Sequence, residues 1–90
     1  MKQLDELKAY RDEIDAIDKE VVKLMEKRLE ICLKVGQYKK ERDLPILNED
    51  REQQVLQNNL SLVENKYYEI YIRNILQTIM DESKKLQASF

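Results

Sequence analysis

The sequence has no histidine and contains only one cysteine, one glycine and one proline. The absence of histidine excludes a histidine-based catalytic triad and the usual zinc sites, and the lone Cys32 excludes a disulfide within the chain. The scarcity of glycine and proline leaves little room for turns, which favours long helices over strands. We therefore expect an all-α protein.

The charge and the hydropathy of the chain argue against nucleic acids and membranes as binding partners. The formal net charge is only −2, so the strong positive charge typical of nucleic-acid-binding proteins is missing. No apolar run approaches the roughly 18 residues of a membrane span, and the charged start is not a signal peptide. We expect a cytoplasmic protein that binds neither nucleic acid nor a membrane.

Apolar residues recur with helical spacing through the first forty-odd residues, and cations interrupt them. One row, spaced by seven, contains Leu7, Ile14, Val21 and Val35. Arg28 is the missing member of that row, and Arg11 and Lys39 belong to the adjacent row, which begins at Leu4. Burying a cation without a partner costs several kcal/mol or more. The pattern predicts a small anionic ligand; the alternative is that these cations reach solvent or pair with acids across a helical bundle.

The 90 residues are expected to form one domain with three helices. Pro45 lacks a backbone donor and restrains the preceding residue to extended geometry, which ends the first helix. Asn48 is a suitable N-cap for the second helix. The predicted elements are a helix at 4–42, a turn at 43–48, a helix at 49–63, a turn at 64–66 and a helix at 67–88.

The first predicted helix is too long for one small domain to cover. At 1.5 Å per residue it spans about 58 Å, whereas a compact chain of this size is roughly 30 Å across. Because the apolar stripe continues to both ends of the helix, a second copy of the chain is expected to cover the remainder. An intertwined homodimer with the two long helices side by side is the simplest closed arrangement.

The same helix geometry predicts a site shared between two chains. Arg28 and Lys39 are three helical turns apart on one face, about 16 Å along the axis, and could grip opposite ends of a molecule of roughly ten heavy atoms. Arg11 is about 42 Å from Lys39 along the same helix. It cannot reach that molecule from its own chain, but the Arg11 of an antiparallel partner could.

Polar residues also interrupt the apolar faces of the other two helices. Ser83 and Gln87 continue an apolar row of the third helix, where fraying of the chain end is the alternative explanation. Asn48 and Glu52 lie one turn apart on the inward side of the second helix. For these two, the alternatives are helix capping by Asn48 and an ion pair between Glu52 and an arginine such as Arg51.

In their joint spacing, these residues resemble the all-helical class of chorismate mutase. The resemblance covers essentially the whole chain, so a monofunctional enzyme is expected. It implies an intertwined homodimer that rearranges chorismate to prephenate in the biosynthesis of phenylalanine and tyrosine. The stretches that carry it are Tyr10-Arg11-Asp12-Glu13-Ile14-Asp15-Ala16-Ile17-Asp18, Lys27-Arg28, Val35-Gly36-Gln37-Tyr38-Lys39, Asp50-Arg51-Glu52 and Asp81-Glu82-Ser83 with Gln87.

The resemblance implies two groups of residues around the reacting part of the substrate. Arg28 and the Arg11 of the partner chain would hold the two carboxylates, with Ser83 assisting. Lys39 and Gln87 would donate to the ether oxygen of the breaking bond. The implied catalytic residues are therefore Lys39, Gln87 and Arg28.

A further group would bind the ring hydroxyl. The resemblance implies that Glu52 and position 48 take this hydroxyl, with Arg51 behind them. Members of the class often carry an acid at position 48, whereas this chain has Asn48. A backbone contact at this position can survive the change, so Asn48 is kept among the expected binding residues.

The implied rearrangement is intramolecular and needs no nucleophile, metal, cofactor or proton shuttle, which suits a chain without histidine. The nearest alternative is an isochorismate-pyruvate lyase on the same fold, because its substrate is a similar dianion. A third interpretation, from a different class, is a helical dimerisation module without catalysis.

Overall fold

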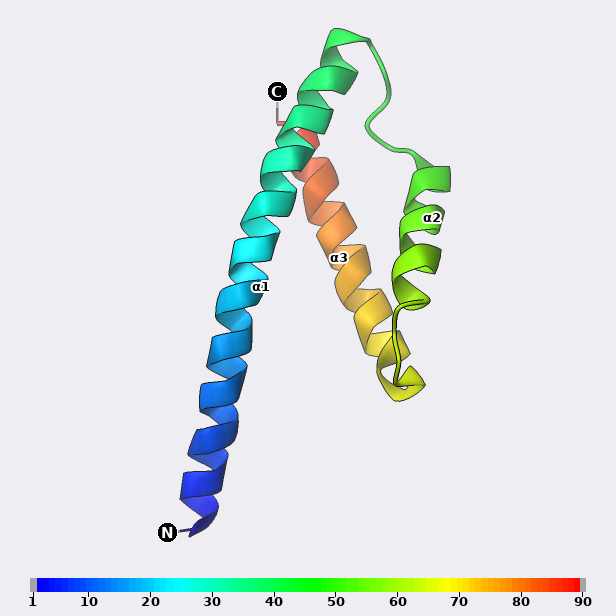
Figure 1. The fold of residues 1–90 in the computed structure, drawn as a ribbon. Coiled ribbons are helices and arrows are strands. Elements are labelled where there is room, and N and C mark those ends of the chain that lie inside the picture. Colours follow the sequence, from blue (N-terminus) through cyan, green and yellow to red (C-terminus); the bar gives the residue numbers. More distant parts are fainter. Residues whose placement is uncertain (1, 90) are drawn as a thin grey trace. The chain divides into compact units, whose positions relative to one another are not determined.

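The computed structural model describes residues 2–89, with side chains from residue 5 onward, and this part of the chain contains helices and turns but no strand (Figure 1). The three-helix, all-α fold predicted from the sequence is confirmed. The side chain of Leu4, which begins one of the predicted rows, lies outside the described residues. In chain order the elements are helix α1 (Lys2–Glu41), helix α2 (Glu49–Leu60), the short 3-10 helix η1 (Lys66–Tyr68) and helix α3 (Glu69–Gln87).

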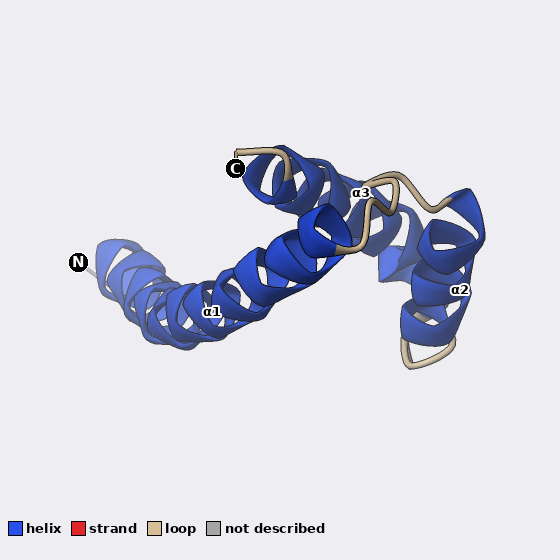
Figure 2. Cartoon of the chain, turned by 90° about the horizontal axis from the view of Figure 1, so that it is seen from above, coloured by secondary structure: helices blue, strands red, loops and turns tan. Residues whose placement is uncertain are grey.

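The chain divides into two compact units, residues 1–31 and 32–90. The first consists of the N-terminal part of α1, and the second combines the last turns of α1 with α2, η1 and α3. Figure 2 shows the helices α1, α2 and α3 and the loops that connect them. The organisation as one domain stays a prediction. Within residues 2–89, no helix is long and apolar enough to cross a membrane.

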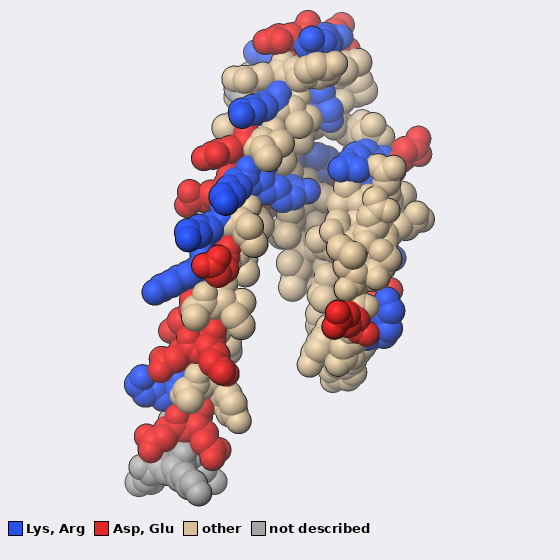
Figure 3. Space-filling model, in the orientation of Figure 1, with Lys and Arg blue, Asp and Glu red and all other residues tan. Residues whose placement is uncertain are grey.

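The first unit exposes its apolar row. The exposed fractions of Leu7, Ile14 and Val21 are 42%, 54% and 49%, and charged side chains occupy much of the visible face of the same helix (Figure 3). Full burial of one such apolar side chain stabilises a protein by about 1.5–3 kcal/mol. An amphipathic helix depends on packing of its apolar face for most of its stability. The row is therefore a surface that another helix would stabilise.

The core of the second unit lies between α2 and α3. Leu56 and Leu60 of α2 are 4% and 6% exposed, and Met80 of α3 is 4% exposed. Ser83, three residues after Met80 on α3, is equally buried at 4%. Residues three apart on a helix are neighbours on its surface, so the apolar core continues directly into a polar region.

Helix α1 ends in a turn that folds the chain back on itself. Asp43 has a left-handed backbone conformation with φ 56°, at the position after a helix that glycine usually occupies. The N–H of Leu44 donates to the carbonyl of Lys39 at 2.8 Å, and that of Asp43 donates to the carbonyl of Lys40 at 3.3 Å. These two bonds form a Schellman motif. The motif directs the following residues, up to Ile46, back toward the last turn of α1.

The ends of the other helices depart slightly from the predicted bounds. Helix α2 ends at Leu60 instead of residue 63, because Leu62 and Val63 donate only three residues back, to the carbonyls of Asn59 and Leu60 at 3.1 and 3.2 Å. The apolar period persists through this turn although the helix does not. Helix α3 begins two residues late, because the side chain of Asn65 caps the 3-10 helix η1 before it.

Candidate active site

Lys39 lies near the end of α1, and the turn that follows fixes its ammonium group. Its Nζ donates to the carbonyl of Ile46 at 2.8 Å and to Oε1 of Gln87 at 3.3 Å. The Schellman motif explains the first contact, since it returns Ile46 to the helix that carries Lys39. An ammonium group has three hydrogens, so two protein acceptors leave one hydrogen for a ligand.

Gln87, at the end of α3, is oriented by this contact. The carbonyl oxygen of its side chain accepts from Lys39, so the amide nitrogen, which can only donate, is directed elsewhere. The structure thus brings together a charged donor and a neutral donor from residues 48 positions apart in the sequence. Both side chains are partly buried, where a hydrogen bond is stronger than in water.

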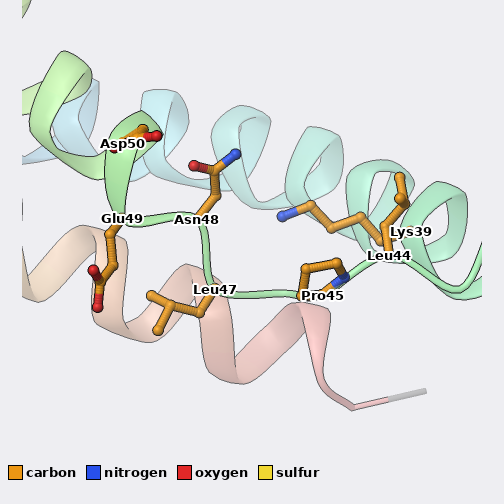
Figure 4. Close-up of a pocket in the computed structure, with 7 residues that line it drawn as sticks. All are labelled: Lys39, Leu44, Pro45, Leu47, Asn48, Glu49 and Asp50. Carbon is orange, nitrogen blue, oxygen red and sulfur yellow. The ribbon is translucent and has the colours of Figure 1, made fainter.

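An open depression of about 530 Å³ lies beside Lys39, formed by the loop before α2 (Figure 4). The side chains of Lys39 and Asn48 extend to the same side of this loop, whereas those of Leu47 and Glu49 point to the opposite side. An ammonium group from α1 and an amide group from the loop therefore lie on the same side of the loop. The lining residues are Lys39, Leu44, Pro45, Leu47, Asn48, Glu49 and Asp50.

Asn48 is the N-cap of α2. Its Oδ1 accepts a hydrogen bond from the N–H of Arg51 at 3.0 Å. Asn48 therefore caps helix α2, as the sequence suggested. Capping uses the amide oxygen and leaves the amide hydrogens for other partners. The guanidinium of Arg51 donates to Oε1 of Gln54 at 2.7 Å.

Glu52, one turn into α2, pairs with Lys84 of α3 and not with Arg51, which corrects the alternative considered from the sequence. The distance between Lys84 Nζ and Glu52 Oε1 is 2.7 Å. Arg51 is adjacent to Glu52 in the chain, and consecutive helix residues do not face each other. Lys84 faces Glu52 across the packed helices instead.

Lys84 is a residue of this region that sequence reasoning missed. It follows Met80 by four residues and so shares the buried face of α3, which was the available signal. Its Nζ also lies 3.4 Å from Oδ1 of Asp81. The contact with Glu52, followed by the attraction of Asp81, raises the pKa of Lys84 above its usual 10.5, against partial burial, which lowers it.

The Glu52 carboxylate depends on this lysine for its charge compensation. Its Oε1 is shielded from solvent, and the side chains of Glu52 and Lys84 are only 22% and 31% exposed. The ammonium of Lys84 lies 2.7 Å from this oxygen, so its positive charge compensates the negative charge of the carboxylate. A shielded carboxylate without such a partner would be strongly unfavourable.

Ser83, the residue before Lys84 on α3, is buried. Its hydroxyl donates to the carbonyl of Ile79 at 2.6 Å, a common arrangement for serine within a helix. In this conformation the hydroxyl proton points to the helix backbone. The side chain must rotate before it can donate to a bound anion.

The remaining two predicted residues, Arg11 and Arg28, belong to the first unit. Arg11 is exposed and Arg28 is half-buried on α1. The role of Arg11 at the site of another chain stays a prediction. The predicted site residues that the structure gathers in the second unit are Lys39, Asn48, Glu52, Ser83 and Gln87.

The gathered residues can bind and orient an anion and supply hydrogen-bond donors to it. Lys39 and Gln87 provide donors, and Glu52 and Asn48 provide an acceptor and a further amide. Among the described residues, no group of three or more histidine, cysteine, aspartate or glutamate side chains is placed to hold a metal ion. These residues suit a reaction driven by binding and electrostatic stabilisation.

Comparison with known proteins identifies the class to which this helical site belongs. The family described as chorismate mutase type II matches residues 10–88. The chain belongs to this family, which confirms the resemblance found in the sequence. No solved structure matches the chain significantly.

Individual relatives agree with this assignment. A bifunctional chorismate mutase/prephenate dehydratase of Buchnera aphidicola subsp. Acyrthosiphon pisum is 38% identical over 88 residues, which is 90% of this chain and 22% of the relative. A 4-amino-4-deoxychorismate mutase of Streptomyces pristinaespiralis is 30% identical over 84 residues, 92% of this chain and 65% of the relative. The chain spans about a quarter of the length of the bifunctional relatives that it matches.

Proposed function

We propose that this chain catalyses the rearrangement of chorismate to prephenate. The observation that carries the proposal is the pairing of the Lys39 ammonium with the Gln87 amide, at 3.3 Å, in a member of the chorismate mutase type II family. The reaction breaks an ether carbon–oxygen bond and forms a carbon–carbon bond within one molecule. It transfers no proton and needs no nucleophile, which suits a site made of donors and charges.

Lys39 and Gln87 act on the ether oxygen. Negative charge grows on this oxygen as its bond to carbon breaks, and a donor already in place there lowers the barrier by about 3–4 kcal/mol. The third ammonium hydrogen of Lys39 and the amide hydrogens of Gln87 supply such donors. Their mutual hydrogen bond keeps them aligned before substrate arrives, so little reorganisation is needed during the reaction.

Arg28 and the Arg11 of a partner chain hold the two carboxylates of the substrate, with Ser83 assisting after rotation of its hydroxyl. Holding a flexible dianion in the folded, reactive conformation is an orientation effect potentially worth several kcal/mol. Arginine suits this task because its planar guanidinium can bind a carboxylate through two parallel hydrogen bonds.

Glu52 and Asn48 bind the ring hydroxyl at the other end of the substrate, with Arg51 in a supporting position. A carboxylate has about four lone-pair positions, so the contact with Lys84 still leaves acceptors on Glu52. Asn48 uses its side-chain oxygen as a cap and retains amide hydrogens that can donate to the hydroxyl oxygen.

The proposed active form is an intertwined homodimer. The apolar row of the first unit, including Leu7, Ile14 and Val21, is 42–54% exposed in the single chain. A second copy would bury this row, and it would bring its own Arg11 to the site. The cytoplasmic location expected from the sequence stays a prediction.

Two other reactions compete with this proposal. Isochorismate-pyruvate lyase activity would use the same cations, since isochorismate is a similar dianion. The name of the Streptomyces relative adds 4-amino-4-deoxychorismate, which carries an amine where chorismate has the ring hydroxyl. Chorismate is favoured because Glu52, the acid at this end of the site, already has a cationic partner.

A product assay with matched variants tests the proposal. The protein is incubated with chorismate and, separately, with isochorismate, and the products are identified. Prephenate from chorismate is expected, with a loss of about 10²-fold or more in kcat/KM for Lys39→Ala. Lys40→Ala, the exposed neighbour, should retain activity. Pyruvate from isochorismate without prephenate would support the lyase, and a dimer that converts neither substrate would support a dimerisation module.

A further inference from the structure

The ion pair of Lys84 with Glu52 lies at the end of the site that is proposed to bind the ring hydroxyl. Lys84 precedes Gln87 by three residues on α3, so these two residues are neighbours on the helix surface. Its Nζ is 2.7 Å from Glu52 Oε1 and 3.4 Å from Asp81 Oδ1. The mechanism proposed above gives it no contact with the substrate.

The pair changes what Glu52 offers to a ligand. A lone shielded carboxylate would attract a cationic group strongly. With the ammonium of Lys84 in contact, the carboxylate keeps its acceptor positions but much of its charge is compensated. Position 48 adds no negative charge, because it is Asn48 instead of an acid. This end of the site therefore suits a neutral hydroxyl better than an ammonium group.

We propose that Lys84 determines substrate selectivity at this ring position, by making the site accept a hydroxyl and disfavour an amine. The inference rests on the proposed function, because it uses Glu52 as the ligand of the ring substituent. A protonated amine on the substrate would meet the ammonium of Lys84 beside the same carboxylate. Placing like charges together is an effective way to reject a wrong ligand.

Asp81 does not cancel this effect. It lies farther from the ammonium than Glu52 does, its side chain is 49% exposed, and it accepts a hydrogen bond from Gln77 at 3.1 Å. Solvent screens an exposed charge more than a shielded one. The charge that the Glu52 carboxylate offers to a ligand is therefore set mainly by its close contact with Lys84.

The test compares chorismate with 4-amino-4-deoxychorismate as substrates of the full chain. The wild-type protein should show the higher kcat/KM with chorismate. Lys84→Met retains the apolar stem without the charge, and it should shift the ratio of the two kcat/KM values toward the amino substrate by about tenfold or more. Lys84→Arg keeps the charge and should keep the wild-type preference.

Lys85→Met is the matched control. Lys85 is the next residue, its side chain is 73% exposed, and it pairs with Glu82 on the same helix. The Lys85→Met substitution removes the same charge from the chain without a change beside Glu52. The ratio of the two kcat/KM values should therefore stay at the wild-type value. Lys84→Gln is a second variant, with an amide that can still donate to Glu52, in case Lys84→Met does not fold.

The outcomes separate the inference from the proposed function. A wild-type protein that converts chorismate but prefers the amino substrate would overturn the role of Lys84, as would an unchanged ratio in a folded Lys84→Met or Lys84→Gln variant. A wild-type protein that converts neither substrate would instead refute the proposed function. A purely structural role would lower both rates together and leave their ratio unchanged.

Discussion

Replacing Gln87 by glutamate turns the neutral donor of the proposed site into a group that must be protonated before it can donate. The new carboxyl group would lie near the Lys39 ammonium, which is 3.3 Å from the present amide oxygen. An adjacent positive charge favours the ionised carboxylate, so its pKa should lie below the ordinary value of about 4.3. At neutral pH the Gln87→Glu variant should therefore accept from Lys39 and donate to nothing.

The expected loss follows from the fraction of protonated carboxyl groups. With a pKa near 4.3, roughly one group in 500 is protonated at pH 7, and a lower pKa reduces this fraction further. Loss of one prearranged donor lowers kcat by about 10²–10³. Both considerations give a fall of about 10²–10³ in kcat/KM at pH 7. The activity should recover as the pH falls, because more of the carboxyl group is then protonated.

The measurement is kcat/KM for chorismate between pH 4 and pH 8. The wild-type rate should persist between pH 6 and 8, since an amide does not titrate. Gln53→Glu, an exposed position on α2, adds the same negative charge away from the site and should follow the wild-type profile. The reasoning would be refuted by a Gln87→Glu variant as active as the wild type at pH 7. A wild-type rate that is lost between pH 6 and 8 because of the Gln87 position would refute it too.

Three further results are expected. When chains that carry Arg11→Ala are refolded together with chains that carry Lys39→Ala, each mixed dimer should contain one intact site. Random pairing should then give about a quarter of the wild-type activity. A mixture as inactive as its parents would contradict a shared site. Met80→Ala should lower the free energy of unfolding by about 2–5 kcal/mol, because Met80 is only 4% exposed. Ile70→Ala, at a position that is 57% exposed, should change this free energy little. Both are measured by urea titration at fixed protein concentration. Contact with Glu52 raises the pKa of Lys84 above 10.5. The stabilisation from this pair should therefore be complete below pH 10.5 and disappear as the pH rises through the raised pKa. A Lys84→Met variant that loses stability over the same pH range as the wild type would show that the pair does not contribute.

The sequence predicted the helices because each carries a long apolar period and because Pro45 and Asn48 mark the break between the first two. Its errors lie at the ends of helices, where local hydrogen bonds decide. The turn after α1 is one such case. A Schellman motif is usually recognised by glycine, whereas here Asp43 adopts the left-handed conformation. The sequence therefore gave no sign that Ile46 would return to Lys39.

Among the site residues, polar interruptions of apolar rows were informative and charge pairing was not. Ser83 and Gln87 stood out because a buried face of α3 should have been apolar at their positions. Lys84 did not stand out, since lysine is usually exposed and its half-buried partner, Glu52, lies on another helix. Partners across helices depend on how the helices pack, and one sequence contains no direct record of that packing.

The two polar ends of the proposed site are linked by the rotational position of α3. Gln87 meets Lys39 at one end and Lys84 meets Glu52 at the other, and the two α3 residues are less than one helical turn apart. The packing of α3 against α2 sets the rotation of this helix about its axis, so one packed pair of helices positions a donor for the ether oxygen and a cation beside the ring-binding acid. The two functions remain separable by chemistry. A change at Gln87 acts on charge that develops during the reaction, so it should lower the rate for either substrate. A change at Lys84 acts on a charge that a substrate already carries, so it should alter the preference between substrates.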